Sequence, residues 1–321
     1  MAKIINDMMG NDTTTFGSVV AIGNFDGVHI GHQSLIKLIL ERAKSKNSNS
    51  GILSFEPHPR EFFDKKKQNF KIMSLESRRE KLSKTGIDFI IELPFNKSVA
   101  NMEPSAFIED ILHKKFGITH IIIGQDFKFG KARSGNSETL KRLGKTFGIE
   151  VEVFEIRKSS NLNISSSRIR DLIKTGKVEA ANDLLGSCHS VIGKVQKGEQ
   201  RGRKLGFPTA NIQFGKCIIP RFGVYASSVR ILDTHDKKIY KGATSIGTRP
   251  TFGINYPNLE VYIFEFDKDI YGLEIEVKLK FFIRSEITFS DTKTLIRQME
   301  EDCTEIKKIL KGAKKYNAKN F

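Results

Sequence analysis

The ten residues 23–32, GNFDGVHIGH, join an apolar run to a helical pattern and contain three glycines and two histidines. A glycine-rich turn that enters a helix directs backbone N–H groups and the positive end of the helix dipole at an anion. Gly23 and Gly27 let the backbone turn tightly, and His29 and His32 stand close enough to aim donors at one point. The pattern predicts stabilisation of charge on a phosphate group during its transfer.

Two other interpretations of this stretch remain open. Its histidines can bind zinc, which needs three or four ligands, but His58 is the only other histidine among the first hundred residues. The stretch can also be a structural turn in which the two histidines have no chemical function.

Two later segments place polar groups where a phosphate site needs them. GQDFKFG, residues 124–130, follows an apolar run and offers Asp126 at the end of an expected strand. NISSSRIR, residues 163–170, offers three consecutive serine hydroxyls and the guanidinium of Arg168 just before a helical pattern. These groups suit a phosphate cradle, although an ordinary series of helix N-caps is the alternative.

A second candidate site lies in RGRKLGFPTANI, residues 201–212. Thr209 and Asn211 supply hard oxygen atoms on one side of an extended segment, which suits Mg²⁺ bound together with nucleotide phosphates. Glu260 begins the strand pattern LEVYIFEF on the same face as Tyr262 and Phe264, and its carboxylate is a candidate base for a substrate hydroxyl. The alternatives are a proline-anchored turn at Pro208 and a strand-end glutamate without chemical function.

The elements that must position these groups differ between the two halves. In the first half, apolar strand patterns at 18–23, 50–57, 87–95, 118–127 and 149–156 alternate with helical patterns at 33–45, 74–86, 103–117 and 137–148. This alternation predicts an α/β domain with a parallel sheet covered by helices on both faces. Ligands of such sheets bind beyond the carboxyl ends of the strands, where GNFDGVHIGH, FEPHPREFF (55–63) and GQDFKFG are all expected.

In the second half, strand patterns follow one another at 190–195, 223–232, 239–247, 259–267 and 273–283, with no helical pattern before Asp291. They predict a small antiparallel β-barrel with one C-terminal helix. We expect two domains, residues 1–185 and 186–321.

The chain has 321 residues and a formal net charge of +16. The charge indicates either a lysine-rich solvated surface or attraction of anionic substrates such as nucleotides or a nucleic-acid strand. There is no tryptophan and no aromatic-basic repeat, so charge alone does not establish nucleic-acid binding. The absence of a long apolar run and of a signal-peptide pattern, with the widely spaced Cys188, Cys217 and Cys303, predicts a cytoplasmic protein without membrane contacts.

The strand before GNFDGVHIGH, together with GNFDGVHIGH, GQDFKFG and ISSSRIR, resembles the Rossmann-like nucleotidyltransferase module of bacterial bifunctional riboflavin kinase/FAD synthetases. The resemblance places the family's two histidines on residues 29 and 32, its Asp-Phe pair on 126–127 and its Ser-Ser-Thr-Arg motif on 165–168, with Ser167 replacing the usual threonine. It implies catalytic functions for His29, His32 and Arg168. It implies nucleotide binding by Gly23, Asn24, Phe25, Gly31, Asp126, Ser165, Ser166 and Ser167.

FEPHPREFF also matches this family, in which that loop lies beside the flavin. The resemblance therefore makes five apolar residues candidates for the flavin-binding wall, namely Phe55, Pro57, Pro59, Phe63 and Phe127.

GFPTAN, GVY, IGTRPTFG, LEVYIFEFD and DIYG resemble, in this order, the riboflavin kinase module of the same family. The resemblance makes Thr209 and Asn211 ligands of Mg²⁺ and phosphate, Glu260 the catalytic base, and the KGEQRGRKLG loop with Gly206 a cover for ATP. This sequence departs from the family pattern at Tyr262, where histidine is frequent, and in GATSIGTRP, which has Thr-Ser where Ala-Asn is common. Both departures bear on flavin contacts rather than on the catalytic residues.

The resemblance extends from about residue 17 to 310 and implies a bifunctional flavin enzyme. Its kinase domain would make FMN from riboflavin and ATP, and its adenylyltransferase domain would make FAD from FMN and a second ATP. ATP, riboflavin and FMN are then its partners, with transient homo-oligomers left open and no nucleic acid expected. The rivals are an adenylyltransferase whose barrel only binds flavin, and a basic nucleic-acid-binding protein on the same fold.

Overall fold

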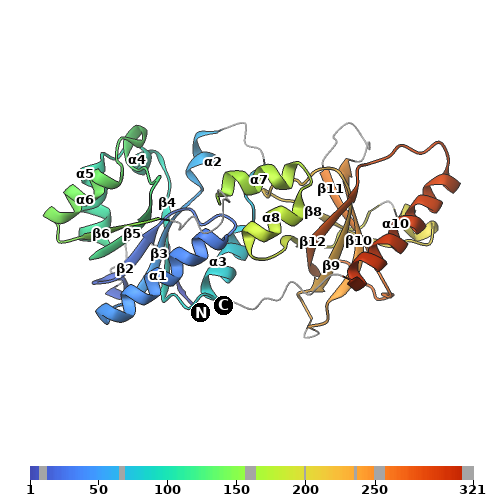
Figure 1. Ribbon diagram of the computed structural model, residues 1–321, viewed down its shortest axis with the longest axis horizontal. Helices are drawn as coiled ribbons and strands as arrows, with labels where there is room; N and C mark the ends of the chain where they lie inside the picture. Colours follow the sequence, from blue (N-terminus) through green and yellow to red (C-terminus); the bar gives the residue numbers. More distant parts are fainter. Residues whose placement is uncertain are drawn as a thin grey trace. The chain divides into compact units, whose positions relative to one another are not determined.

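A computed structural model describes residues 1–6, 13–64, 69–155, 164–198, 200–234, 237–248 and 257–312. The chain forms two compact units (Figure 1). The first contains Met1–Lys67 and Leu75–Asn163, and the second contains Gln68–Ser74 and Ile164–Asn320. Among the described residues, no helix combines the length and apolar character that a membrane span requires.

The first unit is built on a parallel sheet, as the alternating pattern predicted. Its strands are β1 (Lys3–Ile5), β2 (Val19–Ile22), β3 (Ser50–Glu56), β4 (Phe89–Pro94), β5 (His120–Gly124) and β6 (Glu150–Phe154). Their order is β1-β4-β3-β2-β5-β6, so the winding direction reverses between β2 and β5. Ligands of open parallel sheets bind beyond the carboxyl ends of the strands at such a reversal. GNFDGVHIGH leaves β2 and GQDFKFG leaves β5 at this point.

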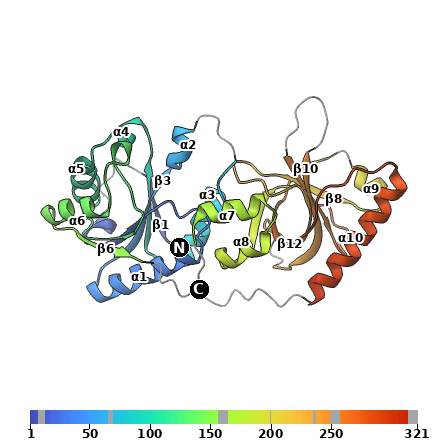
Figure 2. The ribbon, with the colours of Figure 1, turned by 45° about the horizontal axis from the view of Figure 1, so that its top comes forward.

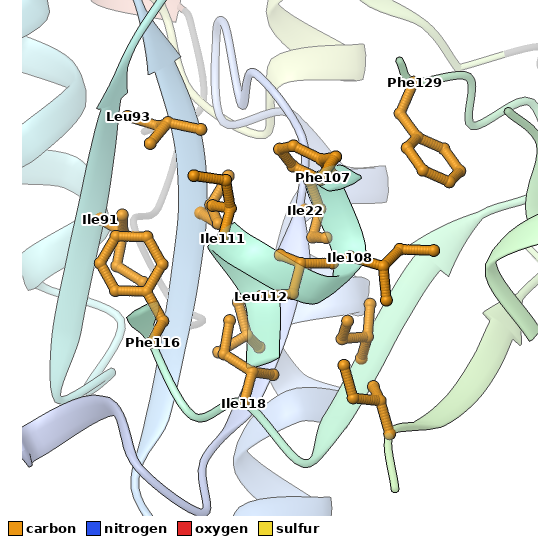
Figure 3. Close-up of a cluster of buried hydrophobic side chains, with 14 of the residues drawn as sticks. Ile22, Ile91, Leu93, Phe107, Ile108, Ile111, Leu112, Phe116, Ile118 and Phe129 are labelled. Carbon is orange, nitrogen blue, oxygen red and sulfur yellow. The ribbon is translucent and has the colours of Figure 1, made fainter. Parts of the chain in front are cut away.

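The first unit also contains helical segments. They are α1 (Ile30–Lys46), α2 (Pro59–Phe63), α3 (Leu75–Ser83), α4 (Lys97–Ala100), α5 (Pro104–Ala106), the π-helical segment Phe107–Lys115 and α6 (Ser137–Thr146). Figure 3 shows apolar side chains of the π-helical segment, including Phe107, Ile111 and Leu112, against Ile22 and Ile91 of the strands. Burial of this apolar stripe fixes the segment on the sheet.

The second unit begins with two helices, α7 (Ser166–Lys174) and α8 (Val178–Leu185), and continues with strands. The strands are β7 (His189–Lys194), β8 (Thr209–Gln213), β9 (Gly223–Ile231), β10 (Tyr240–Thr248), β11 (Pro257–Ile263) and β12 (Glu274–Arg284). They form an antiparallel sheet in the order β7-β12-β9-β10-β11-β8. Beyond β7, the N–H of Gln196 donates to the carbonyl of Asn211 on β8 at 2.8 Å, so the two ends of the sheet meet and the predicted barrel is confirmed.

The barrel has an apolar interior and a helix on its outer face. On β11, Leu259, Val261 and Ile263 are buried in the interior cluster. The alternate residue Tyr262 packs on the opposite face, in a cluster with Cys303 and other residues of α10 (Thr292–Gly312). Figure 2 shows α10 running along this side of the barrel. The predicted C-terminal helix therefore covers the face to which Glu260 also belongs.

A short segment from the first half of the sequence belongs to the second unit. Ile218 donates its N–H to the carbonyl of Lys71 at 2.8 Å, and Arg170 of α7 donates through Nε to the carbonyl of Phe70 at 2.8 Å. Ile72 is 1% exposed in a cluster formed with α7 and α8. By these contacts, α7 and α8 belong with the barrel, whereas the domain boundary at 185/186 stays a prediction.

Candidate active sites

The turn over residues 23–29, which we call the nucleotide turn, has an unusual backbone. Phe25 and Val28 adopt positive φ angles of 51° and 42°, and Gly27 has a φ of 88°. Positive φ is unfavourable for residues other than glycine and is found mostly where the surrounding structure enforces it. The side chain of Phe25 is 1% exposed, and burial of this ring holds the turn in its shape.

His29 and His32 come together at the start of α1. His29 is the N-cap residue, and its Nδ1 accepts a hydrogen bond from the backbone N–H of His32 at 3.2 Å. The two rings stack with centroids 3.6 Å apart and an interplanar angle of 14°. Because Nδ1 of His29 is an acceptor, a neutral His29 carries its proton on Nε2, where it can serve as a donor.

The pKa of His32 lies well below its usual value, first because burial disfavours the charged ring, and then because a charge on the His29 ring and the charge of Lys81 would oppose it. His32 is therefore a neutral imidazole at neutral pH. Its Nδ1 and Oδ1 of Asn24 are both buried and have no hydrogen-bond partner among the described residues. Unpartnered buried polar atoms are costly, which favours a polar ligand at this end of α1.

The zinc alternative has no support from the described part of the chain. There, no group of three or more histidine, cysteine or acidic side chains is arranged to hold a metal ion. His58 instead caps α2, with Nδ1 accepting from the N–H of Arg60 at 3.0 Å.

Three side chains bind carbonyl groups of the nucleotide turn. Nη1 of Arg78 donates to the carbonyl of Asn24 at 3.2 Å, and Nζ of Lys81 donates to that of Gly27 at 3.2 Å. Nε2 of Gln33 donates to the carbonyl of Val28 at 2.8 Å. Sequence reasoning missed these supports. The pattern SLESRREKLSKTG predicts a helix here but does not show which of its basic residues face the protein.

The predicted flavin residues Phe55, Phe63 and Phe127 are joined by a continuous series of ring contacts through three aromatic residues that the sequence did not single out. Consecutive centroid distances along Phe63–Phe95–Phe55–Phe107–Phe129–Phe127 are 5.8, 5.6, 6.4, 5.7 and 5.5 Å. Phe63 is 67% exposed. Phe107 and Phe129 are buried in the core, so the series connects the predicted residues through the interior, and the exposed Phe63 ring is the part that can contact a planar ring system such as a flavin.

The other predicted residues of the first unit lie near the ends of strands and helices or in turns. Asp126 is exposed at the turn after β5. Pro57 is exposed after β3, and Pro59 opens α2 at its first turn. A Cβ at Gly23 would lie 3.3 Å from the Phe25 ring, a tight contact that would require the ring to shift slightly, and Gly31 is buried in α1.

The serine and arginine motif opens α7 in the second unit. Oγ of Ser165 accepts from the N–H of Arg168 at 3.3 Å and caps the helix, which is the local structure that the N-cap alternative predicted. Ser166 is partly buried, while Ser167 and Arg168 are exposed. Phosphate binding by this motif stays a prediction.

The predicted kinase residues meet on the outer face of the barrel. Asn211 pairs with Glu260 across β8 and β11, and Oγ1 of Thr209 donates to Oε2 of Glu260 at 3.2 Å. Oδ1 of Asn211 accepts from Nδ2 of Asn258 at 2.9 Å. The cross-strand register thus brings together a hydroxyl, an amide and a carboxylate from segments about 50 residues apart. Sequence reasoning did not identify Asn258.

A cavity of about 290 Å³ opens beside Thr209. Its walls are Val195, Arg203, Pro208, Thr209, Ala210, Val261, Ile263, Phe266, Asp267, Lys268, Asp269, Ile270 and Tyr271. It therefore joins the GFPTAN and DIYG segments. Gly206, at φ 88°, ends the turn after α9 (Arg201–Lys204). Residues 249–253 of IGTRPTFG, and Glu199 of the loop expected to cover ATP, lie outside the described residues.

Tyr262 occupies the position where the family often has histidine. Its ring makes edge contacts with Phe207 and Phe264, at centroid distances of 5.4 and 5.6 Å. The substitution therefore extends the aromatic surface beside the GFPTAN segment.

Comparisons with known proteins agree with this arrangement of two sites. A family model described as FAD synthetase matches residues 12–168, and one described as riboflavin kinase matches residues 185–310. A bifunctional riboflavin kinase/FMN adenylyltransferase from Buchnera aphidicola subsp. Schizaphis graminum is 36% identical over 309 residues, covering 95% of this chain and 98% of its own. A protein of the same name from Haemophilus influenzae is 36% identical over 300 residues, covering 94% and 96%.

The fold also resembles a crystal structure named macrolide-efflux protein from Streptococcus pneumoniae, with a TM-score of 0.84, 28% identity and coverage of 97% of this chain and 99% of that one. Because relatives more than 30% identical align with almost the whole chain and both domain models match in order, this protein belongs to the bifunctional riboflavin kinase/FMN adenylyltransferase family.

Proposed function

We propose that this protein phosphorylates riboflavin with ATP to give FMN, and then transfers AMP from a second ATP to FMN, giving FAD and pyrophosphate. One observation carries the bifunctional assignment: each of the two units holds its own candidate site. The stacked histidines cap α1 in the first unit, and Thr209 contacts Glu260 in the second.

In the kinase reaction, the 5′-hydroxyl oxygen of riboflavin would attack the γ-phosphorus of ATP, and the bond to the β-phosphate oxygen would break. Glu260 would accept the hydroxyl proton. The hydrogen bond from Thr209 fixes the carboxylate at one oxygen, which orients it for this transfer. The cavity between GFPTAN and DIYG is our candidate for the ATP site.

The residues around Glu260 fit a magnesium ion. Mg²⁺ prefers hard oxygen ligands and needs few from the protein when nucleotide phosphates complete its shell, and Thr209, Asn211 and Glu260 offer three such side chains within one cross-strand group. Thr209 and Asn211 would hold the ion, which when bound supplies neutralisation of phosphate charge.

In the adenylyl transfer, a phosphate oxygen of FMN would attack the α-phosphorus of ATP, and pyrophosphate would leave. FMN already carries an anionic nucleophile, so the step needs positioning and charge stabilisation rather than a strong base. Nε2–H of His29, the neutral His32 and the positive end of α1 would stabilise charge on the phosphates. Arg168 and the hydroxyls of Ser165, Ser166 and Ser167 are further proposed phosphate ligands, and Phe55, Phe63 and Phe127 the proposed flavin contacts.

We place this enzyme in the cytoplasm, with small molecules and at most transient homo-oligomers as its partners. All three cysteines are free thiols, as is usual for proteins of a reducing compartment.

Two variants test the two halves separately. Glu260→Gln should lower FMN formation from riboflavin by roughly 100-fold or more, while FAD formation from supplied FMN stays within about threefold of wild type. Combined His29→Ala and His32→Ala should do the reverse, with a loss of roughly 100-fold in FAD formation. Both reactions are followed by chromatography of the flavins in the presence of ATP and Mg²⁺.

Matched controls are available in each unit. Glu265→Gln removes an exposed carboxylate just beyond β11, and His113→Ala removes an exposed histidine from the π-helical segment. Both should leave the two activities near wild type. A wild-type protein that forms neither FMN nor FAD contradicts the proposed function, and a full kinase rate in Glu260→Gln contradicts the assigned base.

A further inference from the structure

Arg78 touches three segments of the first unit although the proposed chemistry does not use it. The residue lies on α3 and is 5% exposed. Nη1 donates to the carbonyl of Asn24 in the nucleotide turn at 3.2 Å, and Nη2 donates to Oε2 of Glu56 at 3.3 Å. The same Nη2 lies 3.6 Å from Oε1 of Glu92 on β4. Arg78 thereby joins the nucleotide turn to the end of β3, where the proposed flavin segment, residues 55–63, begins.

The pair with Glu92 does not by itself explain this arginine. Glu92 is already held by Arg79, whose Nε and Nη2 bind its two oxygens at 2.9 and 2.5 Å. A buried guanidinium is costly to desolvate, and Nε of Arg78 is buried without a hydrogen-bond partner among the described residues. Arg78 is not needed to hold Glu92, so the two contacts that Arg78 makes outside Glu92 are the informative ones.

Those two contacts hold the nucleotide turn and the flavin segment, which would bind the two substrates. The carbonyl of Asn24 directly precedes Phe25, whose φ of 51° is held in an unfavourable region. Glu56 directly precedes Pro57, where the flavin segment leaves the sheet. Adenylyl transfer depends on the alignment of the FMN phosphate with the α-phosphorus of ATP, and misplacement by about 1 Å can cost about 100-fold in rate.

We propose that Arg78 is a positioning residue for the adenylyl transfer. It holds the nucleotide turn and the flavin segment at fixed positions relative to each other. This inference rests on the proposed function of the first unit. Each substrate keeps its own contacts when the link is broken, so the loss should appear in the chemical step rather than in binding. Arg78 therefore acts on kcat more than on either KM.

The test is a steady-state analysis of FAD formation from FMN and ATP, with KM measured for each substrate. Arg78→Met should lower kcat by 10- to 100-fold and change each KM by less than threefold. Arg78→Lys keeps the charge and reaches one acceptor at a time, so it should recover part of the loss. Arg79→Met is the matched control, because Arg79 shares Glu92 with Arg78; it should stay within threefold of wild type.

Glu56→Gln provides a second route if Arg78→Met does not fold, since it weakens the same link from the flavin side and keeps the side-chain shape. It should lower kcat for FAD formation by 3- to 30-fold. FMN formation from riboflavin is measured on every variant and should stay at the wild-type rate.

The possible results separate the two proposals. An unchanged kcat in Arg78→Met or in a folded Glu56→Gln overturns the positioning function, as does a rise in the KM for ATP alone. Equal losses in the Arg78→Met and Arg79→Met proteins also overturn it, because they would indicate only a shared structural cluster. Absence of FAD formation by the wild-type protein contradicts the proposed function instead.

Discussion

At the scale of single residues, His189 shows how burial sets the charge of a side chain. The residue is 2% exposed at the start of β7, and Nε2 has no hydrogen-bond partner among the described residues. Its backbone N–H donates to Oδ1 of Asn182 at 2.6 Å. Burial lowers the pKa of His189 to about 4 from the ordinary 6.5, so the ring is neutral in the folded protein.

This shift makes the stability of the second unit depend on pH. Between the two pKa values the unfolded chain binds a proton that the folded chain does not, so stability falls as pH decreases through this window. From pH ~7.5 to pH ~5 the expected loss is about 2 kcal/mol. His189→Leu should remove this part of the pH dependence of the unfolding free energy, measured by urea unfolding of the second unit at several pH values. The exposed His113→Gln control should keep it, and parallel curves for wild type and His189→Leu would contradict the prediction.

The residues of the nucleotide turn were predictable because their signal is local. Glycines and histidines within ten positions, between a strand and a helix, allow few arrangements, and His29 indeed caps α1. Arg78 and Lys81 were not predictable, because a helix rich in exposed charges does not reveal which of them turns inward. The contact of Thr209 with Glu260 depends on the register of β8 against β11, which neither segment specifies alone.

At the scale of elements, strands within long apolar runs were predicted well and short elements were missed. β2 to β6 all lie within or beside expected runs, because continuous apolar strands are typical of a sheet buried on both faces. β1 has three residues and α2 has five, too few for a period to show. α8 buries Val178, Ala181 and Leu185 at helical spacing, but we predict no helix here from the sequence, only a domain boundary directly after residue 185.

The attachment of α10 to the barrel gives a prediction at the same scale. Arg284 of β12 binds both oxygens of Asp302, with Nε–Oδ1 and Nη2–Oδ2 distances of 2.8 and 2.6 Å, and Asp302 is 5% exposed. Asp302→Asn keeps the shape but leaves the guanidinium without its carboxylate, at an expected cost of about 2 kcal/mol. Glu301→Gln breaks an exposed pair with Arg297 and should cost less than about 0.5 kcal/mol. Equal shifts of the two variants in urea unfolding would contradict this account.

At the scale of the whole molecule, the order of residues along the chain does not follow the division into units. The chain passes into the second unit at Gln68, returns to the first at Leu75 and passes again at Ile164. No local pattern predicts such a crossing, because a single apolar residue such as Ile72 shows no hydrophobic periodicity. The consequence is that a barrel fragment starting at residue 186 lacks Ile72, α7 and α8, with which Ile218 packs.

Ile72 therefore contributes to the stability of the second unit, which holds the kinase site, although it lies in the first quarter of the sequence. Ile72→Ala leaves a cavity among Ile169, Ile173 and Ile218, and such a change costs about 2–5 kcal/mol. On heating, the variant should lose riboflavin kinase activity at a lower temperature than the wild-type protein. Ile90→Ala, at a buried site of β4 in the first unit, should instead lower the temperature at which FMN adenylyltransferase activity is lost and leave the kinase near wild type. If Ile72→Ala kept the wild-type temperature for loss of kinase activity, the segment 68–74 would not stabilise the second unit, and the division of the chain at Gln68 and Leu75 would be wrong.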